Sequence, residues 1–113
     1  MGKRERDKGK RVELLLRDKL REFGWAGAER GQQRHGGPDS PDVRYGPTGC
    51  HFECKGVESL RLTAAIRQAE ADAGPGEAPI VVWKKSRAPW VAILPLDVLL
   101  ALLCEHEARE LLE

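Results

Sequence analysis

Three side chains near the middle of the chain are of the types that can hold a divalent cation against a phosphate group: Asp42, Glu53 and Lys55. The sequence Gly-Pro-Thr-Gly at positions 46–49 is typical of a turn. A hairpin closed by this turn would set Asp42 opposite Glu53, with Cβ atoms roughly 5 Å apart, where like charges are unfavourable. A bound Mg²⁺ would remove the conflict, because this ion is commonly held by one or two carboxylates. We therefore predict a Mg²⁺ site here, in which Mn²⁺ can substitute.

Lys55 follows Glu53 by two residues, so a strand would direct both side chains to one face. Phe52 and Cys54 would then point to the opposite face, into the core. A metal ion polarises a phosphoryl oxygen and lowers the pKa of a bound water. A lysine ammonium beside it can orient that water or offset the charge that develops on the phosphate. Together these groups predict hydrolysis of a phosphodiester.

Two further polar residues are candidates for the same site. Glu13 lies beside the apolar stripe of a predicted helix, and its carboxylate could reach the ion directly or through water. Gln68 lies among three alanines of a later helix, where it could support Lys55 or bind a metal-bound water. Taken singly, each candidate also fits an ordinary surface, turn-capping or ion-pair role. Their joint placement favours a catalytic set of Glu13, Asp42, Glu53, Lys55 and Gln68.

The apolar pattern along the chain predicts the elements that must position these residues. Val12, Leu16 and Leu20 recur at helical spacing, which indicates a helix stopped by Gly24. Runs of β-branched residues indicate strands, and residues 31–41, rich in Gly, Pro, Gln and Ser, indicate a loop. The predicted elements are a helix over Arg4–Phe23, strands over Asp42–Tyr45 and Cys50–Lys55, a helix over Leu60–Ala73, strands over Pro79–Trp83 and Trp90–Leu94, and a helix that begins at Pro95.

This order of elements predicts a single α/β domain over residues 1–113, with a mixed β-sheet flanked by helices. The strand at Pro79–Trp83 must cross over to pair with the hairpin, through a right-handed connection that contains the second helix. A chain of 113 residues has room for one modest core and no separate binding domain. The apolar faces of Ile80–Trp83 and Leu96–Leu103 are each candidates for core or for a surface between two copies.

Basic residues are concentrated in the first third of the chain, although the net charge is only +1. Residues 1–37 contain eleven lysines and arginines against six acids, whereas the last ten residues contain four glutamates and one arginine. This asymmetry favours a face for a polyanion, although a solvated charged helix gives the same pattern. Such phosphate contacts position a nucleic acid without reading its sequence. The expected contacts are Lys8, Lys10, Arg11, Arg30, Arg34, Lys84, Lys85 and Arg87.

The three cysteines fit no disulfide framework and indicate free thiols in a reducing compartment. Cys50 and Cys54 lie near His51, which raises zinc as an alternative, but a structural zinc site needs closely spaced ligand pairs. No apolar run could span a bilayer, and the first residues lack the apolar stretch of a signal peptide. We therefore expect a cytoplasmic protein without membrane contacts, in the host cytoplasm if a phage encodes it.

Pro41-Asp42, followed after ten residues by Glu53-Cys54-Lys55, resembles the signature of PD-(D/E)XK nucleases. The upstream helical glutamate and the later helix with its glutamine fit the same pattern. Within that class the chain looks like the archaeal and phage Holliday junction resolvases, through RHGGPDSPDV at 34–43 and HFECKGVESLRLTAAIRQAEADAG at 51–74. The resemblance extends from about Lys8 to Leu103. Pro38-Asp39 could be aligned instead, but Asp42 is followed directly by Val43 of the predicted strand and is the one set opposite Glu53.

The resemblance implies a restriction-endonuclease-like core and a homodimer that cuts two opposed strands of a four-way DNA junction. It implies metal ligands at Asp42, Glu53 and the backbone carbonyl of Cys54, with Glu13 as the helical acid. It also implies Lys55 as the catalytic lysine and Ser40 as a DNA contact. Two alternatives remain: another nuclease of the class, acting on ends, flaps or mismatches, and a DNA-binding module without activity.

Overall fold

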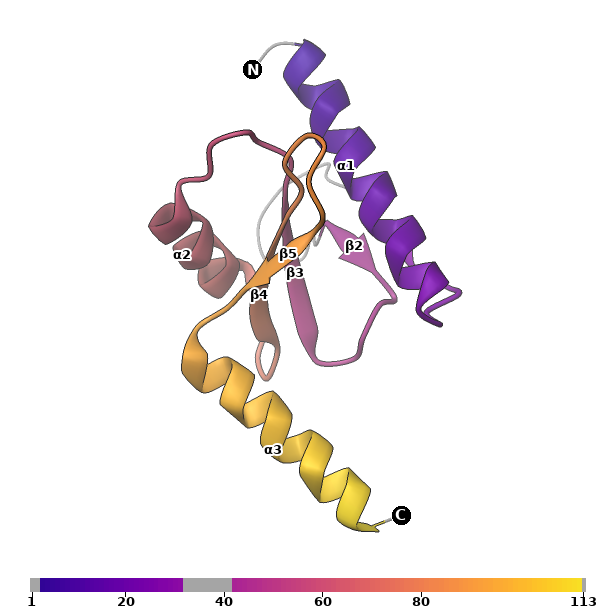
Figure 1. Cartoon of the computed structure of the whole chain (residues 1–113), viewed down its shortest axis with the longest axis vertical. Coiled ribbons are helices and arrows are strands. Elements are labelled where there is room, and N and C mark those ends of the chain that lie inside the picture. Colours follow the sequence, from indigo (N-terminus) through magenta and orange to yellow (C-terminus); the bar gives the residue numbers. More distant parts are fainter. Residues whose placement is uncertain (1–2, 32–41, 113) are drawn as a thin grey trace.

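Three helices and five strands make up the part of the chain that the computed structural model describes, which is residues 3–31 and 42–112 (Figure 1). The predicted helices and the two later strands are confirmed, with bounds that shift by one to two residues. Gly24, whose φ of 114° favours glycine, follows the first helix closely, as expected. The elements are α1 (Lys3–Glu22), β1 (Glu29–Arg30), β2 (Val43–Arg44), β3 (Cys50–Lys55), α2 (Leu62–Asp72), β4 (Ala78–Trp83), β5 (Val91–Ile93) and α3 (Leu96–Leu112).

The central sheet is mixed, as the sequence predicts. Its strand order is β3-β4-β5, with β3 parallel and β5 antiparallel to β4. Glu53 pairs with Val81, which in turn pairs with Ile93. The connection from β3 to β4 contains α2, so the predicted crossover is present. β1 and β2 form a separate antiparallel pair.

Helices cover both faces of this sheet, because the strand period of two divides the residues of β4 between them (Figure 1). On one face, Ile80 and Val82 lie in a buried cluster with Leu16 and Leu20 of α1. On the other face, Val81 packs against two alanines of α2. Val81 is almost completely buried, which contributes about 1.5–3 kcal/mol. The run at Ile80–Val82 is therefore core.

The predicted hairpin between Asp42–Tyr45 and Cys50–Lys55 is wrong. β2 pairs with β1, in the register Glu29 with Arg44, and β3 pairs with β4. Tyr45 has a φ of 62°, in the left-handed region, which ends β2 and turns the chain out of an extended course. Asp42 and Glu53 are therefore not cross-strand neighbours, and the argument from hairpin register does not hold.

The last helix, α3, extends away from the sheet (Figure 1). Leu102 packs against the cluster beneath α1, but the predicted apolar face lies in solvent. Its members are Leu96, Leu99, Leu100 and Leu103, which are 38–64% exposed. This face is therefore not core within a single chain. In the described residues, no helix is both long enough and apolar enough to cross a bilayer.

Gly56 lies against α1, where a methyl group on its Cα would collide with the side chain of Val12. We expect Gly56→Ala to lower the free energy of unfolding by about 1–3 kcal/mol, the usual cost of overpacking, as measured by urea denaturation. Gly9→Ala in α1 is the control, because nothing lies within 4 Å of an added Cβ there. That change should stabilise the protein by about 0.5–1 kcal/mol. The double variant Val12→Ala/Gly56→Ala should lose less stability than the sum of the losses of the two single variants, because the colliding side chain is shortened. Additive losses would refute the contact.

Candidate active site

Strand β3 divides its side chains between the core and a polar face. Phe52 and Cys54 pack against the cluster beneath α1. Lys55 points to the other side, where its Nζ donates a hydrogen bond to Oε1 of Gln68 on α2, at 2.8 Å. By alternation, His51 and Glu53 share the face of Lys55. The face that lies under α2 is therefore the one that carries ionisable groups.

Lys55 is held on this face by two partners and remains accessible. Its Nζ lies 3.8 Å from Oε2 of the buried Glu53, in addition to the bond with Gln68. Lys55 and Gln68 both line an open hollow of about 280 Å³. Arg61, the residue before α2, lines the same hollow. Arg61 could not be singled out before the structure was known, because only the fold brings it beside Lys55.

Asp42 reaches β3 through its side chain instead of through a β-ladder. The backbone amide of Cys54 donates a hydrogen bond to Oδ2 of Asp42, at 2.6 Å. A strand residue directs its N–H and C=O to the same side, so the Cys54 carbonyl faces the edge where Asp42 lies. The opposite edge of β3 is occupied by β4. The Asp42 carboxylate and the Cys54 carbonyl therefore meet at one edge, as the resemblance implies for a metal site.

Glu13 of α1 joins Asp42 at this edge. It is buried, and Nε of Arg30 donates a hydrogen bond to its Oε1 at 2.6 Å. Burial, followed by the negative charge of Asp42, raises the pKa of Glu13, although Arg30 opposes the shift. Arg30, predicted to contact phosphate, is therefore engaged with Glu13. Two carboxylates that repel each other in a buried position are an arrangement that a cation would stabilise.

Two groups of acids flank Cys54: Asp42 and Glu13 lie at one edge of β3, and Glu53 lies on its α2 face. In the described residues, the carboxylate oxygens of these three acids do not all lie within 4.8 Å of one another. Burial, and then the charges of Asp42, Glu13 and Glu53, raise the pKa of the Cys54 thiol. Elements distant in sequence thus bring the predicted carboxylates to one strand, by a route that differs from the predicted hairpin. All three cysteines are free thiols, as expected.

His51 and Asp72 are further polar residues beside Glu53, and neither was predicted to belong to the site. Nε2 of His51 lies 3.5 Å from Oε1 of Glu53, and both side chains are buried. The Glu53 carboxylate raises the pKa of His51 by stabilising the charged imidazolium, although burial opposes this. One ligand atom from each of His51, Glu53 and Asp72 lies within 4.8 Å of the others. Only the packing of α2 on β3 reveals Asp72, whereas the spacing of His51 from Glu53 was visible in the sequence.

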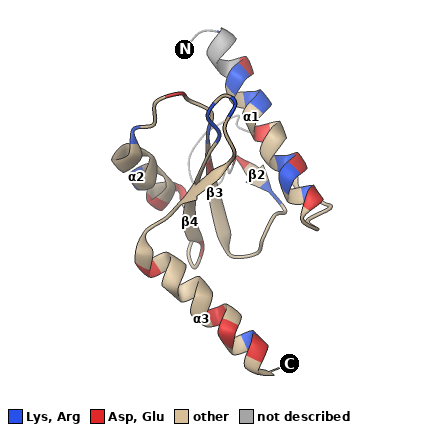
Figure 2. Ribbon diagram, in the orientation of Figure 1, with Lys and Arg blue, Asp and Glu red and all other residues tan. Residues whose placement is uncertain are grey.

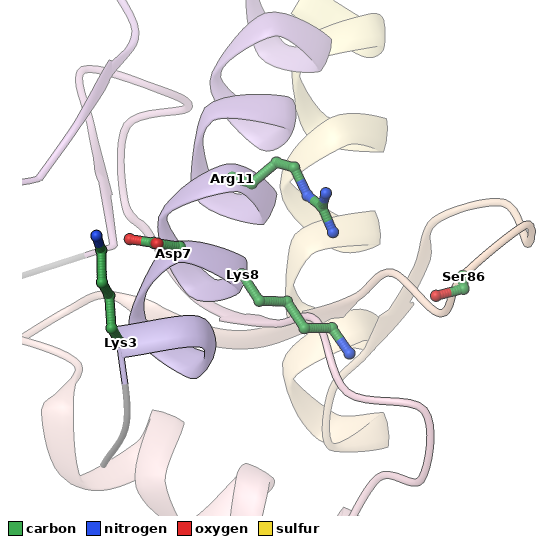
Figure 3. Close-up of a pocket in the computed structure, with 5 residues that line it drawn as sticks. All are labelled: Lys3, Asp7, Lys8, Arg11 and Ser86. Carbon is green, nitrogen blue, oxygen red and sulfur yellow. The ribbon is translucent and has the colours of Figure 1, made fainter.

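Lysine and arginine positions lie along α1 and in the loop between β4 and β5 (Figure 2). This loop adjoins the first half of α1, and the two segments form what we call the basic end of the molecule. Lys8 and Arg11 line an open hollow of about 700 Å³ with Ser86 of this loop (Figure 3). The backbone amide of Ser86 donates a hydrogen bond to Glu58. Hydrogen bonding to Ser86, followed by the positive charges of Lys8 and Lys85, lowers the pKa of Glu58. Since Glu58 follows Lys55 by three residues, the basic end adjoins the end of β3 that carries Lys55. The other predicted contacts here are Lys10, Lys84 and Arg87, whereas Arg34 and Ser40 lie outside the described residues.

Comparisons with protein families, with curated proteins and with solved structures found no match for this chain. The groups of the site themselves indicate its chemistry. Carboxylate and carbonyl oxygens at the edge of β3 can bind a hard divalent cation. An ammonium group that is hydrogen-bonded on one side and open on the other can bind an anion. The arrangement suits a reaction at a phosphate that is brought in from the basic end.

The contact between Glu13 and Asp42 can be tested by removing one charge. We expect Glu13→Gln to raise the melting temperature in EDTA by a few degrees, equivalent to about 1 kcal/mol, because the repulsion from Asp42 is relieved. The same change should reduce the stabilisation that Mg²⁺ gives, which for a saturated site reaches about 2.7 kcal/mol at 100 times Kd. Differential scanning fluorimetry with and without Mg²⁺ measures both effects.

Glu22→Gln, at the exposed end of α1, is the matched control and should change neither quantity. A Glu13→Gln protein that is less stable in EDTA and responds normally to Mg²⁺ would mean that Glu13 serves only as the partner of Arg30.

Proposed function

We propose that this chain is a metal-dependent DNA endonuclease that resolves four-way junctions by paired phosphodiester hydrolysis. The observation that carries the proposal is the bond from the Cys54 amide to Asp42, because it brings Asp42, with Glu13 beside it, to the strand that bears Glu53 and Lys55. The matching PD-(D/E)XK motif residues support it. The order helix, strand, helix, strand around the site is consistent with a restriction-endonuclease-like core.

The donor set fits Mg²⁺, with Mn²⁺ as a substitute. Asp42, Glu53 and the carbonyl of Cys54 would hold the ion, and Glu13 would reach it directly or through water. All these donors are oxygen, which is the ligand type that Mg²⁺ prefers. The repulsion between Glu13 and Asp42 supports the fit, because burial and the charge of Asp42 both disfavour ionised Glu13 and a cation would relieve this. When bound, the ion supplies Lewis-acid polarisation of a phosphoryl oxygen and activates a water.

Lys55 provides the positive charge that the protein itself contributes to the reaction. Its ammonium has three N–H donors, one of which is directed to Gln68. The others can bind the attacking water or the phosphate oxygens, on which negative charge increases in the transition state. Gln68 fixes the ammonium without neutralising it. Arg61, at the rim of the same hollow, can hold the neighbouring phosphate.

The basic end of the molecule is the proposed DNA surface. Lys8 and Arg11 of α1 line its hollow with Ser86. Lys10 comes from the same helix, and the β4–β5 loop supplies Lys84, Lys85 and Arg87. These cations would bind phosphates without reading bases, which suits recognition of branched structure. Binding should therefore weaken steeply as salt increases. Arg34 and Ser40 are proposed as additional contacts on the sequence pattern alone.

The proposed active form is a homodimer. A four-way junction presents two equivalent strands, and a two-fold dimer presents two equivalent sites. The exposed leucines of α3 supply an apolar surface for a second copy. Antiparallel packing of α3 on its copy would place the acidic C-terminal half of one helix beside the N-terminus of the other, where the helix dipole favours negative charge.

Cleavage of a labelled four-way junction in Mg²⁺ tests the proposal. We expect Asp42→Ala, Glu53→Ala and Lys55→Ala each to reduce the cleavage rate by at least about 100-fold, the usual cost of losing one preorganised electrostatic group. Junction binding in a gel-shift assay should persist. Lys19→Ala, an exposed lysine in the second half of α1, is the control and should cut normally.

The substrate panel also separates the alternatives. Preference for linear, flapped or mismatched duplex would favour another nuclease of the class. Tight binding without cleavage under any divalent ion would favour a DNA-binding module. Undiminished cleavage by a variant lacking Asp42, Glu53 and Lys55 would refute the assignment.

The solution mass from light scattering tests the dimer. We expect the wild-type protein to be a dimer and Leu99→Asp combined with Leu103→Asp to be a folded monomer, because the apolar face of α3 is lost. Leu15→Asp on α1 is the matched control, since Leu15 is similarly exposed. A monomeric wild-type protein, or a double variant that still dimerises, would remove α3 from the proposal.

A further inference from the structure

We propose that His51, Glu53 and Asp72 form a binding site for a divalent transition metal ion such as Zn²⁺ or Mn²⁺. This site lies on the α2 face of β3 and shares Glu53 with the proposed Mg²⁺ site. Its other ligands, His51 and Asp72, have no part in the proposed hydrolysis. The inference therefore stands or fails independently of the nuclease proposal.

The spacing of the polar groups around His51 suits a bound ion. His51 is 4% exposed, and in the described structure its Nε2 is buried without a hydrogen-bond partner. The nearest acid, Oε1 of Glu53, is 3.5 Å away. That separation exceeds the 2.7–3.2 Å typical of an N–H···O hydrogen bond. Two ligand atoms each about 2.1 Å from a tetrahedral ion lie about 3.4 Å apart, which agrees with the observed spacing.

The third ligand comes from the last residue of α2. Asp72 is one helical turn beyond Gln68, and Gln68 is bonded to Lys55. Helix α2 thus passes along β3, with Gln68 beside Lys55 and Asp72 beside His51 and Glu53. Asp72 is half-buried, so the position can exchange an ion with solvent.

The donor set determines which ion is favoured. An imidazole nitrogen suits zinc and other first-row transition metals, whereas Mg²⁺ prefers oxygen ligands and retains its waters. One imidazole and two carboxylates leave a fourth position for water, as in three-ligand zinc sites. Glu53 serves both proposed sites, with Oε1 directed to His51 and Oε2 to Lys55. Excess Mg²⁺ should therefore occupy the all-oxygen edge of β3 through Oε2 and leave Oε1, with His51 and Asp72, for a transition metal.

Calorimetric titration of the full chain with Zn²⁺ in saturating Mg²⁺ tests the inference, with Co²⁺ absorption as a second readout of nitrogen ligation. We expect one Zn²⁺ per chain, and affinity at least about 100-fold lower in Asp72→Asn and in His51→Gln, since even second-shell losses cost 10–100-fold. Circular dichroism establishes that each variant is folded. Asp72→Asn remains informative if His51→Gln does not fold, because Asp72 lies nearer the surface.

Three controls assign the signal to this site. Glu70→Gln, an exposed acid of the same helix, should leave Zn²⁺ affinity unchanged. His106→Gln should also leave it unchanged and excludes binding by the exposed His106–Glu110 pair of α3. Asp42→Asn should retain Zn²⁺ binding even where it abolishes cleavage, which separates failure of this inference from failure of the nuclease. Absence of Zn²⁺ binding, or full binding by Asp72→Asn, would overturn the inference and leave His51 as a protonated partner of Glu53.

Discussion

The hydrogen bond from the Cys54 amide to the Asp42 carboxylate ties the start of β2 to the edge of the central sheet. β1 and β2 form a separate pair, and β3 shares its sheet with β4 and β5. A charge-assisted bond to a backbone amide is strong, and this one occupies a position where a neighbouring strand would otherwise pair. Since the bond involves a backbone donor, any residue except proline at position 54 would provide it, whereas position 42 needs a side chain with an oxygen acceptor. The site therefore depends on Asp42 for its architecture as well as for its charge.

Local sequence signals predicted the helices and strands but not which strands pair. The helical spacing of apolar residues in α1 and the β-branched run of β4 reflect burial, and both patterns are visible in the sequence. The partner of β2 depends on residues 29–30, and the partner of β3 lies across α2, so neither is a local matter. The turn chemistry at 46–49 was compatible with a hairpin, but the left-handed conformation of Tyr45 takes the chain elsewhere. Asp42 approaches β3 nonetheless, through its side chain.

Glu53, Lys55 and Gln68 lie close together because their placement has two independent sources. Alternation along β3 sets Glu53 and Lys55 on one face regardless of which strand lies alongside. Helical spacing brings Gln68 and Asp72 to one side of α2, four residues apart. What the sequence could not supply was the direction of α2 over β3, which decides that Gln68 meets Lys55 and that Asp72 meets His51. Arg61 escaped prediction for the same reason.

Glu53 is the one residue on which every proposed role of the α2 face converges. One of its carboxylate oxygens faces His51 and the other faces Lys55, at 3.5 and 3.8 Å. Neither contact has the length of a good hydrogen bond, so the buried carboxylate is balanced between two partners instead of being committed to one. Burial of an acid without a committed partner is costly. A bound cation, as proposed above, would offset this cost for a carboxylate that lies beside Lys55 and beside Nε2 of His51, which has no hydrogen-bond partner in the described residues.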